Sequence, residues 1–216
     1  MEKNILTPTQ IKVIDLVSGE EKLNDFYLTG GTALAGYYLG HRFSDDLDFF
    51  IFNEPDRIFL HAFVEKIKSE ISASTVRYER LYDRNQFFFN TGDTELKVEF
   101  TKFPFRQLEK SEVINSMRID SLRDIAANKI MAMLDRFEPK DFVDLYFMLK
   151  TRDLSNVVKD SEIKFGKKIG EVFLGSELIK VRRIEAMPKM VIAVSIEELK
   201  VFFIGLAKSL APAIFR

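Results

Sequence analysis

The sequence LTGGT at residues 28–32 is followed, thirteen residues later, by DLDFFIF at residues 46–52. Residues 26–29 are rich in strand-forming side chains, and the two glycines after them are typical of a tight turn. Residues 32–39 then have the spacing of a short helix, and residues 46–52 form a second predicted strand. This order of strand, turn, helix and strand predicts an α/β fold around residues 28–52.

Two acidic side chains alternate with apolar ones in the second predicted strand. Because successive side chains of a strand point to opposite faces, Asp46 and Asp48 share one face, while Leu47 and Phe49 face the core. Two neighbouring carboxylates raise each other's pKa unless a counter-charge lies between them. A divalent cation that prefers oxygen ligands, Mg²⁺ or Mn²⁺, supplies that charge, so the pair predicts a metal site.

A third acid is predicted to lie on the same sheet. In the strand 96–100, Leu96, Val98 and Phe100 form the apolar face, so Glu99 falls on the opposite face together with Lys97. Three carboxylates on neighbouring strands can hold two metal ions, one at an attacking hydroxyl and one at leaving pyrophosphate. The predicted chemistry is therefore transfer at phosphorus, with Asp46, Asp48 and Glu99 as metal ligands.

The glycine turn suits a triphosphate. Gly30 and Gly31 allow close approach of the backbone, and Thr32 adds a hydroxyl at the start of the next helix. A Walker phosphate loop is excluded, because tyrosines at positions 37 and 38 stand where that motif needs Lys and Ser or Thr. Taken singly, a Gly-Gly pair is most often just a turn, and an acidic pair is most often a solvated strand edge. Their combination favours an active site.

Beyond this stretch the pattern predicts further elements of both kinds. Helices are expected from residue 8 to near Gly19 and at residues 55–71, 121–136 and 140–149, with more helices from 153 onward and a last one that starts at Ser195. Strands are expected at 76–81, 86–89 and 95–101. We therefore expect an α/β core over residues 1–110 and a helical C-terminal portion over residues 111–216.

Composition limits the possible chemistry. The chain of 216 residues has no cysteine, which excludes disulfides and thiolate catalysis and is compatible with a cytoplasmic protein. Its two histidines, His41 and His61, lie in different elements, so a histidine metal site has little support. No apolar run is long enough for a membrane span. Residues 151–216 carry 12 basic and 8 acidic side chains, a weak indication of a polyanion-binding surface.

The motifs together resemble a known family. The segments 28–34 and 41–49, and the helical motif of Asp124, Lys129, Arg136, Asp141 and Asp144, look like the AbiEii/AbiGii family of nucleotidyltransferase toxins, within the DNA polymerase beta superfamily. The resemblance implies a polymerase-beta-like core, a mixed sheet flanked by helices. It also implies the toxin of a bacterial toxin–antitoxin pair, with a cognate antitoxin as partner. In studied relatives the enzyme transfers nucleotides from a nucleoside triphosphate to the 3′ end of tRNA.

The helical motif has a second interpretation. On physical grounds Lys129 lies on the core-facing stripe of its helix and needs an anion, while Asp144 is partly buried and needs a partner. An ion pair of Arg136 with Asp141 or Asp144 that locks two helices would be structural. The resemblance favours Lys129 as a triphosphate ligand and Asp144 as part of the site.

Two residues before the acidic strand could also bind phosphate. Arg42 and Ser44 are placed to reach a triphosphate, and an equally good alternative is a loop salt bridge from Arg42 to Asp45. For the acceptor, RNA is the leading hypothesis, steered by basic residues of the C-terminal portion: Lys167, Lys168, Arg182 and Arg183. Transfer to a protein side chain and a catalytically silent binding module are the alternatives.

Overall fold

The computed structural model describes residues 5–92 and 94–210. The chain divides into two compact units. The sheet unit comprises Met1–Tyr38 and Ser44–Ser121, and the helical unit comprises Leu39–Phe43 and Leu122–Arg216. A mixed sheet flanked by helices and a helical C-terminal part confirm the predicted fold class.

The sheet has seven strands in the order β3-β4-β5-β2-β1-β7-β6. Their bounds are β1 Tyr27–Thr29, β2 Leu47–Ile51, β3 Thr75–Leu81, β4 Arg84–Asn90, β5 Glu95–Lys102, β6 Glu112–Ile114 and β7 Met117–Ile119. Strand β2 lies between β1, to which it is antiparallel, and β5, to which it is parallel. The strand that carries Asp48 is therefore interior, and its side chains have neighbours on both sides.

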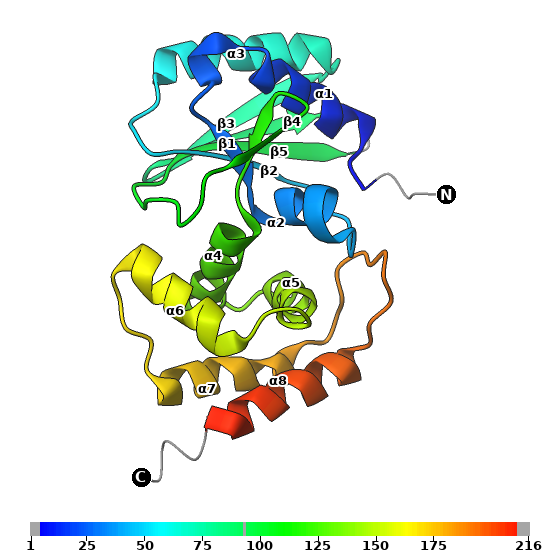
Figure 1. Ribbon diagram of the computed structural model, residues 1–216. Helices are drawn as coiled ribbons and strands as arrows, with labels where there is room; N and C mark the ends of the chain where they lie inside the picture. The colour runs from blue at the N-terminus through cyan, green and yellow to red at the C-terminus, as the bar shows by residue number, and fades with distance from the viewer. Residues whose placement is uncertain (1–4, 93, 211–216) are drawn as a thin grey trace. The chain divides into compact units, whose positions relative to one another are not determined.

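One face of this sheet contributes the core of the sheet unit. Helices α1 (Pro8–Ser18) and α3 (Arg57–Glu70) cover it (Figure 1). The core contains the fully buried rings of Phe49 and Phe100, which stack with centroids 5.3 Å apart. Helix α1 begins as predicted, since Thr7 and Gln10 form a reciprocal capping box. With α1 and α3 on this face, the side chains of Asp48 and Glu99 point to the opposite face.

Strands β6 and β7 lie where the sequence analysis expected the helical portion that starts at residue 111. Strand β7 pairs in parallel with β1 and antiparallel with β6, so both belong to the sheet unit. The units consequently divide between Ser121 and Leu122, whereas the sequence suggested a break after residue 110. The 39–43 segment also joins the helical unit.

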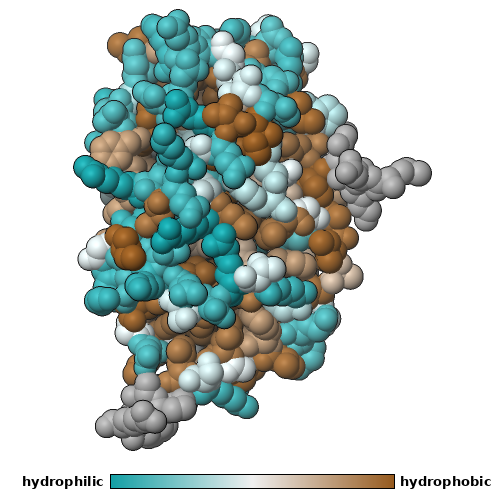
Figure 2. Space-filling model, viewed as in Figure 1, coloured by the Kyte–Doolittle hydropathy of each residue, from teal (hydrophilic) through white to brown (hydrophobic). Residues whose placement is uncertain are grey.

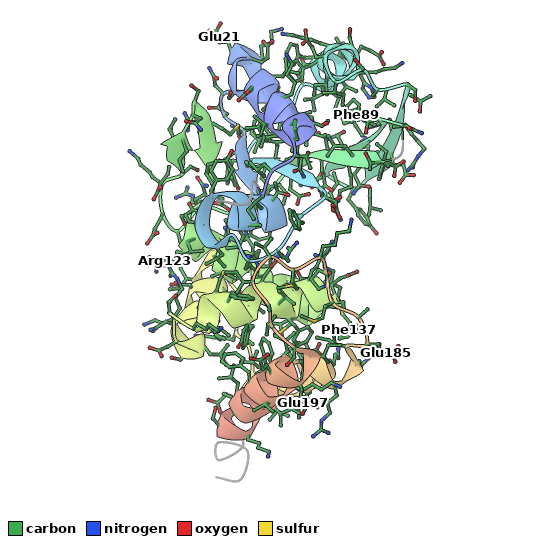
Figure 3. The ribbon with its side chains drawn as sticks, turned by 90° about the vertical axis from the view of Figure 1, so that its right-hand side faces the viewer. Glu21, Phe89, Arg123, Phe137, Glu185 and Glu197 are labelled. Atoms are coloured by element: carbon green, nitrogen blue, oxygen red, sulfur yellow. The ribbon has the colours of Figure 1, made fainter. Side chains whose placement is uncertain are left out.

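The helical unit contains five helices among the described residues: α4 Leu122–Asp135, α5 Pro139–Leu149, α6 Leu154–Phe165, α7 Glu171–Ile179 and α8 Ile196–Leu210, with a short 3₁₀ helix η3 at Lys180–Arg183. Ser195 and Glu198 cap α8 reciprocally, as predicted, since the backbone N–H of each donates to the side chain of the other. The rings of Phe142 and Phe203 join α5 to α8 in its core. Arg123, labelled in Figure 3, joins α4 to α6 through two hydrogen bonds with Asp160.

The outer surface has no dominant apolar region in the view of Figure 2, where brown apolar groups lie among teal hydrophilic ones. Exposed apolar side chains occur on several elements, including Ile58 on α3 and Val201 on α8. None of the helices formed by the described residues combines the length and apolar character that crossing a bilayer requires.

Candidate active site

The glycine pair forms the first turn of a helix. Helix α2 (Gly30–Ala33) begins at Gly30 itself and continues as the π-helical segment η2 (Leu34–Leu39), which corrects the predicted turn before the helix. Gly30 has a φ of +71°, and a Cβ atom there would lie 2.5 Å from Oδ2 of Asp48. Only glycine combines this backbone conformation with this approach, so Gly30 permits the carboxylate to sit against the start of the helix.

Two threonines hold the strand ends beside the glycines. The hydroxyl of Thr32 donates a hydrogen bond to the carbonyl oxygen of Asp46. The hydroxyl of Thr29, which is the β1 neighbour of Asp48, donates to Oδ2 of Asp120 at 2.7 Å. The hydroxyl of Thr32, which the sequence predicts to bind a triphosphate, therefore fixes the backbone of the acidic segment in this structure.

The three predicted metal ligands converge on one face of the sheet. Asp48 and Glu99 are direct neighbours in the parallel pair of β2 and β5, and Asp46 lies one residue before β2. The ammonium of Lys97 lies among them, with Nζ 3.2 Å from Oδ2 of Asp46, 3.9 Å from Oδ1 of Asp48 and 3.7 Å from Oε2 of Glu99. The predicted strand parity thus brings three carboxylates around one cation.

Glu99 is held more firmly than the two aspartates. Its carboxylate accepts two hydrogen bonds from Arg84, both of 2.7 Å, one from Gln86 at 2.8 Å and one from Thr101 at 2.6 Å. Burial would raise the pKa of Glu99, but the hydrogen bonds and charge of Arg84, with the bonds from Thr101 and Gln86, lower it to about 2. Glu99 is therefore ionised and fully engaged by protein donors.

Asp48 has the opposite electrostatic character. Burial first, and the charge of Glu99 second, raise the pKa of Asp48 to about 6, although Lys97 counteracts them in part. Burial lowers the pKa of Lys97, but the surrounding carboxylates outweigh that effect and raise it, so this side chain keeps its charge. The positive charge around Asp48 is too small to offset its burial and the charge of Glu99, so an added cation would stabilise the ionised carboxylate.

The fit of these side chains to a divalent metal differs between the acids. Among the described residues, no three or more His, Cys, Asp or Glu side chains are arranged as a metal-holding group. Apart from Lys97, no hydrogen bond or ion pair engages the carboxylates of Asp46 and Asp48 within the described ranges, whereas the oxygens of Glu99 are taken up by Arg84, Gln86 and Thr101. The carboxylate oxygens of Asp46 and Asp48 fit Mg²⁺, which prefers oxygen ligands. The role of Glu99 as third ligand stays a prediction.

The helical unit contains a second cluster, centred on Asp144. This fully buried carboxylate receives Nε2 of His41 at 2.8 Å, Nε and a terminal nitrogen of Arg42 at 2.6 and 2.8 Å, and Nζ of Lys129 at 2.5 Å. Burial would raise the pKa of Asp144, but the charge of Lys129 and the bonds from Arg42 and His41 outweigh it and hold that pKa well below its usual range. His41 is thus fully buried and bonded to a carboxylate of the same unit.

Lys129 has carboxylate partners within the protein, so its need for an anion is met without a ligand phosphate. Its Nζ also lies 2.8 Å from Oδ1 of Asp141, whose other oxygen accepts a bond of 3.1 Å from Arg136. The predicted link between Arg136 and Asp141 is confirmed. The triphosphate role of Lys129 stays a prediction that rests on the resemblance alone.

Arg42 has a different ion-pair partner from the one expected for the loop before β2, and its predicted phosphate role stays a prediction. Its guanidinium grips Asp144 in a bidentate pair and does not form the expected bridge to Asp45. Ser44 lies in the sheet unit, where its carbonyl oxygen accepts a bond of 2.7 Å from Gln10. Neither residue has a described contact that reveals a phosphate site.

The sequence did not identify Lys97, Arg84 and Gln86 as site residues. Strand parity placed Lys97 on the correct face, and only its charge at the centre of three acids was missed. Arg84 and Gln86 reach Glu99 through the antiparallel register of β4 with β5, in which Gln86 faces Glu99 and Arg84 faces Thr101. Pairing the two predicted strands in this register would have placed both residues beside Glu99.

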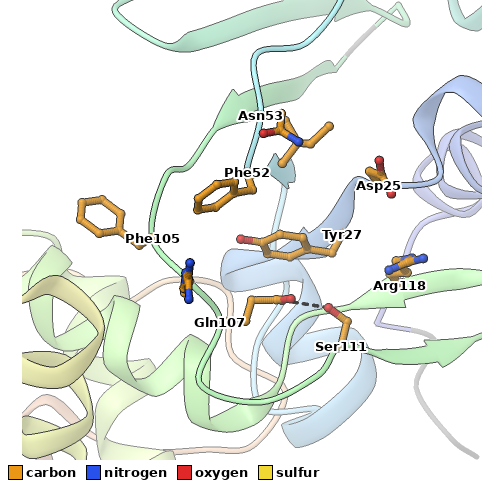
Figure 4. Close-up of a pocket in the computed structure, with 10 residues that line it drawn as sticks. Asp25, Tyr27, Phe52, Asn53, Phe105, Gln107, Ser111 and Arg118 are labelled. Atoms are coloured by element: carbon orange, nitrogen blue, oxygen red, sulfur yellow. Dashed lines mark hydrogen bonds between the residues drawn. The ribbon is translucent and has the colours of Figure 1, made fainter.

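A separate cavity of about 370 Å³ lies in the sheet unit (Figure 4). Tyr27, Phe52 and Phe105 contribute rings to its lining, and Gln107 and Ser111, joined by a hydrogen bond of 2.8 Å, contribute polar groups. None of the predicted site residues lines this cavity. It is therefore distinct from the acidic cluster.

Comparison with known proteins gives a family match over most of the chain. The model of the family described as nucleotidyl transferase AbiEii toxin, type IV TA system, matches residues 15–203. An uncharacterized protein of Aquifex aeolicus is 36% identical over 145 residues, which is 63% of this chain and 66% of that protein. The match thus spans slightly less than two thirds of the length of this relative.

Two solved structures share the fold. The protein JHP933 from Helicobacter pylori superimposes with a TM-score of 0.61, 21% identity and coverage of 95% of this chain and 90% of that one. MenT4, a nucleotidyltransferase toxin from Mycobacterium tuberculosis, superimposes with a TM-score of 0.60, 16% identity and coverage of 94% and 81%. At these identities the likeness extends to the fold alone.

Proposed function

The chain belongs to the AbiEii family of nucleotidyl transferase toxins, and we propose that it transfers nucleotides from a nucleoside triphosphate to RNA in a Mg²⁺- or Mn²⁺-dependent reaction. The observation that carries this proposal is the acidic cluster at the start of α2. There Asp46 and Asp48 present carboxylates with one internal cation between them, and the pKa of Asp48 is raised to about 6. Such a cluster suits a divalent ion.

Asp46 and Asp48 are the proposed metal ligands, with Glu99 as the third acid. A bound metal would neutralise charge on the triphosphate and lower the pKa of the attacking hydroxyl. The protein residues position the reactants: Gly30 lets the carboxylate of Asp48 lie against the start of α2, Thr32 holds the backbone of Asp46 in place, and the backbone at Gly30 and Gly31 is the proposed place for the phosphates. Arg84 fixes the orientation of Glu99.

The roles of Lys129 as a triphosphate ligand and of Asp144 as a site residue remain proposals that rest on family membership. The roles of Arg42 and Ser44 in nucleotide binding remain proposals that rest on their position before the acidic strand. Inside the helical unit Lys129, Asp144 and Arg42 form one buried ion cluster. A cluster of this kind loses much stability when one partner is removed. Activity loss in a variant of these residues therefore identifies a ligand role only if the variant remains folded.

The proposed partners follow from the same family. A cognate antitoxin protein, the tRNA 3′ end as acceptor and a cytoplasmic location are expectations for a toxin of this kind. Support for RNA within the chain comes from four exposed basic side chains of the helical unit: Lys167, Lys168, Arg182 and Arg183. Exposed basic groups attract phosphates without regard to base sequence.

The acceptor is tested by incubating the protein with each α-³²P-labelled nucleoside triphosphate, Mg²⁺ and total bacterial RNA, followed by separation of RNA and protein on a gel. Label in a band of tRNA size that is lost after ribonuclease treatment supports the proposal. Label found only on protein would replace it with the protein-modifying alternative. Absence of transfer from every triphosphate, with either metal, would overturn it.

A further inference from the structure

The Lys97 ammonium lies among acidic side chains of two neighbouring strands, β5 and β2. Lys97 lies in the interior of β5, next to Glu99 and opposite the acidic segment of β2, and its side chain is 19% exposed. Its Nζ lies between 3.2 and 3.9 Å from one oxygen of each of Asp46, Asp48 and Glu99. Lys102 on the same strand is different, since it pairs with Glu54 and is 34% exposed.

The charges of the cluster identify what Lys97 does there. Arg84 binds Glu99 through both oxygens and neutralises it, which leaves Asp46 and Asp48 with Lys97 as their nearby cation. Without Lys97 the two aspartates would repel each other at close range in a partly buried place. The ammonium therefore stabilises the acidic cluster in the protein without metal.

A divalent ion bound between Asp46 and Asp48 would be repelled by this ammonium. Mg²⁺ approaches carboxylate oxygens to about 2.0–2.1 Å and requires nearly octahedral geometry. With Nζ 3.2 Å from Asp46 and 3.9 Å from Asp48, an ion bound between these carboxylates would lie close to a like charge. The ion therefore binds more tightly once the ammonium has withdrawn.

We propose that Lys97 is the resident counter-ion of the candidate metal site, and that its ammonium must withdraw from Asp46 and Asp48 for a divalent cation to bind. This inference rests on the proposed function. Lys97 is a positioning residue, because it keeps the carboxylates together and ionised until metal replaces it. Metal affinity is thereby lowered in the absence of nucleotide, and the displaced ammonium is left near incoming phosphates. Metal and triphosphate then favour each other's binding.

The test is a Mn²⁺ titration without nucleotide, in which electron paramagnetic resonance measures free Mn²⁺. Lys97→Met removes the competing charge and should bind Mn²⁺ at least about tenfold more tightly than wild type, since one nearby unit charge is worth more than a tenfold factor in a partly buried site. Lys97→Arg retains the charge, and Lys102→Met removes a charge outside the cluster. Both should bind as wild type does.

The outcomes separate this inference from the function on which it rests. If wild type binds Mn²⁺ through Asp46 and Asp48 but Lys97→Met binds it equally or more weakly, the counter-ion role is overturned and the metal site remains. If no variant binds Mn²⁺, the metal site itself is wrong and the counter-ion role falls with it.

Thermal unfolding supplies a second readout that does not depend on activity. In EDTA, Lys97→Met should unfold at a lower temperature than wild type, because Asp46 and Asp48 lose their nearby cation, and Mn²⁺ should raise its Tm by more than it raises that of wild type. An equal or smaller rise would contradict the inference. If Lys97→Met cannot be purified without metal, Lys97→Gln replaces it in both measurements, with the same expected results.

Discussion

The carboxylate of Asp48 is the group best suited to bind a metal, and in its ionised form it lowers the stability of the folded protein. Its pKa is raised from 3.8 to about 6, so the folded protein binds a proton more tightly than the unfolded chain does. The corresponding stability is fully present below pH 3.8 and is lost as pH rises through about 6. At neutral pH without metal, the charged group destabilises the fold.

Asp48→Asn should therefore gain stability and lose function. In EDTA at pH 7.5 we expect urea unfolding to show a gain of roughly 1–3 kcal/mol, because one pKa unit corresponds to about 1.4 kcal/mol and partial exposure reduces the effect. The gain should vanish near pH 4. Nucleotide transfer should fall by roughly a thousandfold or more. Asp45→Asn, at an exposed position, is the control and should change neither; a destabilised Asp48→Asn would contradict the electrostatic argument.

Lys129 is predicted to be essential for folding whatever its part in catalysis. Lys129→Ala leaves the buried carboxylates of Asp141 and Asp144 without its charge, which should cost roughly 3–5 kcal/mol in urea unfolding. The pKa values of both aspartates are lowered, so their contribution is present at neutral pH and is lost in acid. A loss below about 1 kcal/mol in Lys129→Ala would contradict the importance of the cluster.

At this scale the sequence predicted side-chain direction better than side-chain partners. Parity within the strand placed Asp46 and Asp48 together on one face, because that property is local. The anion for Lys129 was not foreseen, since Asp141 and Asp144 lie on the next helix and the turn between the helices decides which side chains meet. Arg42 meets Asp144 across 102 sequence positions, for which no local pattern exists.

At the scale of elements, the start of α2 is the most sensitive point of the site. Gly30→Ala would place a Cβ 2.5 Å from Oδ2 of Asp48 at a φ of +71°. We expect a loss of about 1 kcal/mol or more in stability from the backbone conformation. We also expect at least a roughly hundredfold loss of transfer from the displaced carboxylate.

Gly166 provides the matched control for this substitution. Its φ is +64°, and an added Cβ would meet nothing within 4 Å. Gly166→Ala should therefore lose similar stability in urea while it retains transfer. If both alanine variants retain transfer, the close approach of Gly30 to Asp48 has no functional importance.

Strands β6 and β7 were missed because their sequence signal is short and lies in an unusual turn. Each strand has three residues, and β6 has no buried side chain that would reveal alternation. Asn115 and Ser116 join them with φ values of 47° and 67°, a conformation usually marked by Asn-Gly. The longer strands β3, β4 and β5 were predicted because each has seven or eight residues, enough to show a cluster of strand-forming side chains.

At the scale of the whole molecule, the sequence identified the α/β part and the helical part. It did not reveal that the segment Leu39–Phe43, which lies within the α/β part of the sequence, belongs to the helical unit in the structure. Leu39–Phe43 joins the helical unit because His41 and Arg42 are bound to Asp144. Such a pairing depends on the complete fold of the helical unit. Local pattern and composition contain no information about it.

Charge on the helical unit gives the prediction for RNA. Lys167 and Arg182 are exposed, whereas Lys168 pairs with Glu162 and Arg183 lies on the ring of Phe137, so the first two are the cleaner targets. The double variant Lys167→Glu and Arg182→Glu should lower RNA labelling by roughly tenfold or more at low salt, weaken its salt dependence and leave triphosphate binding unchanged.

Arg57→Glu with Lys110→Glu is the control, since both residues are exposed and lie in the sheet unit. This double variant changes the net charge by the same amount. Equal RNA labelling by both double variants, measured across a salt series, would show that the basic residues of the helical unit do not steer RNA.

The most direct test of the central claim is the Mg²⁺-dependent rate of nucleotide transfer by Asp46→Asn relative to wild type, with circular dichroism to confirm that the variant is folded. The proposed role of Asp46 in holding the metal predicts that wild type transfers label only when Mg²⁺ or Mn²⁺ is present, and that Asp46→Asn is slower by roughly a thousandfold or more at every metal concentration. A folded Asp46→Asn protein that transfers label at nearly the wild-type rate would contradict it.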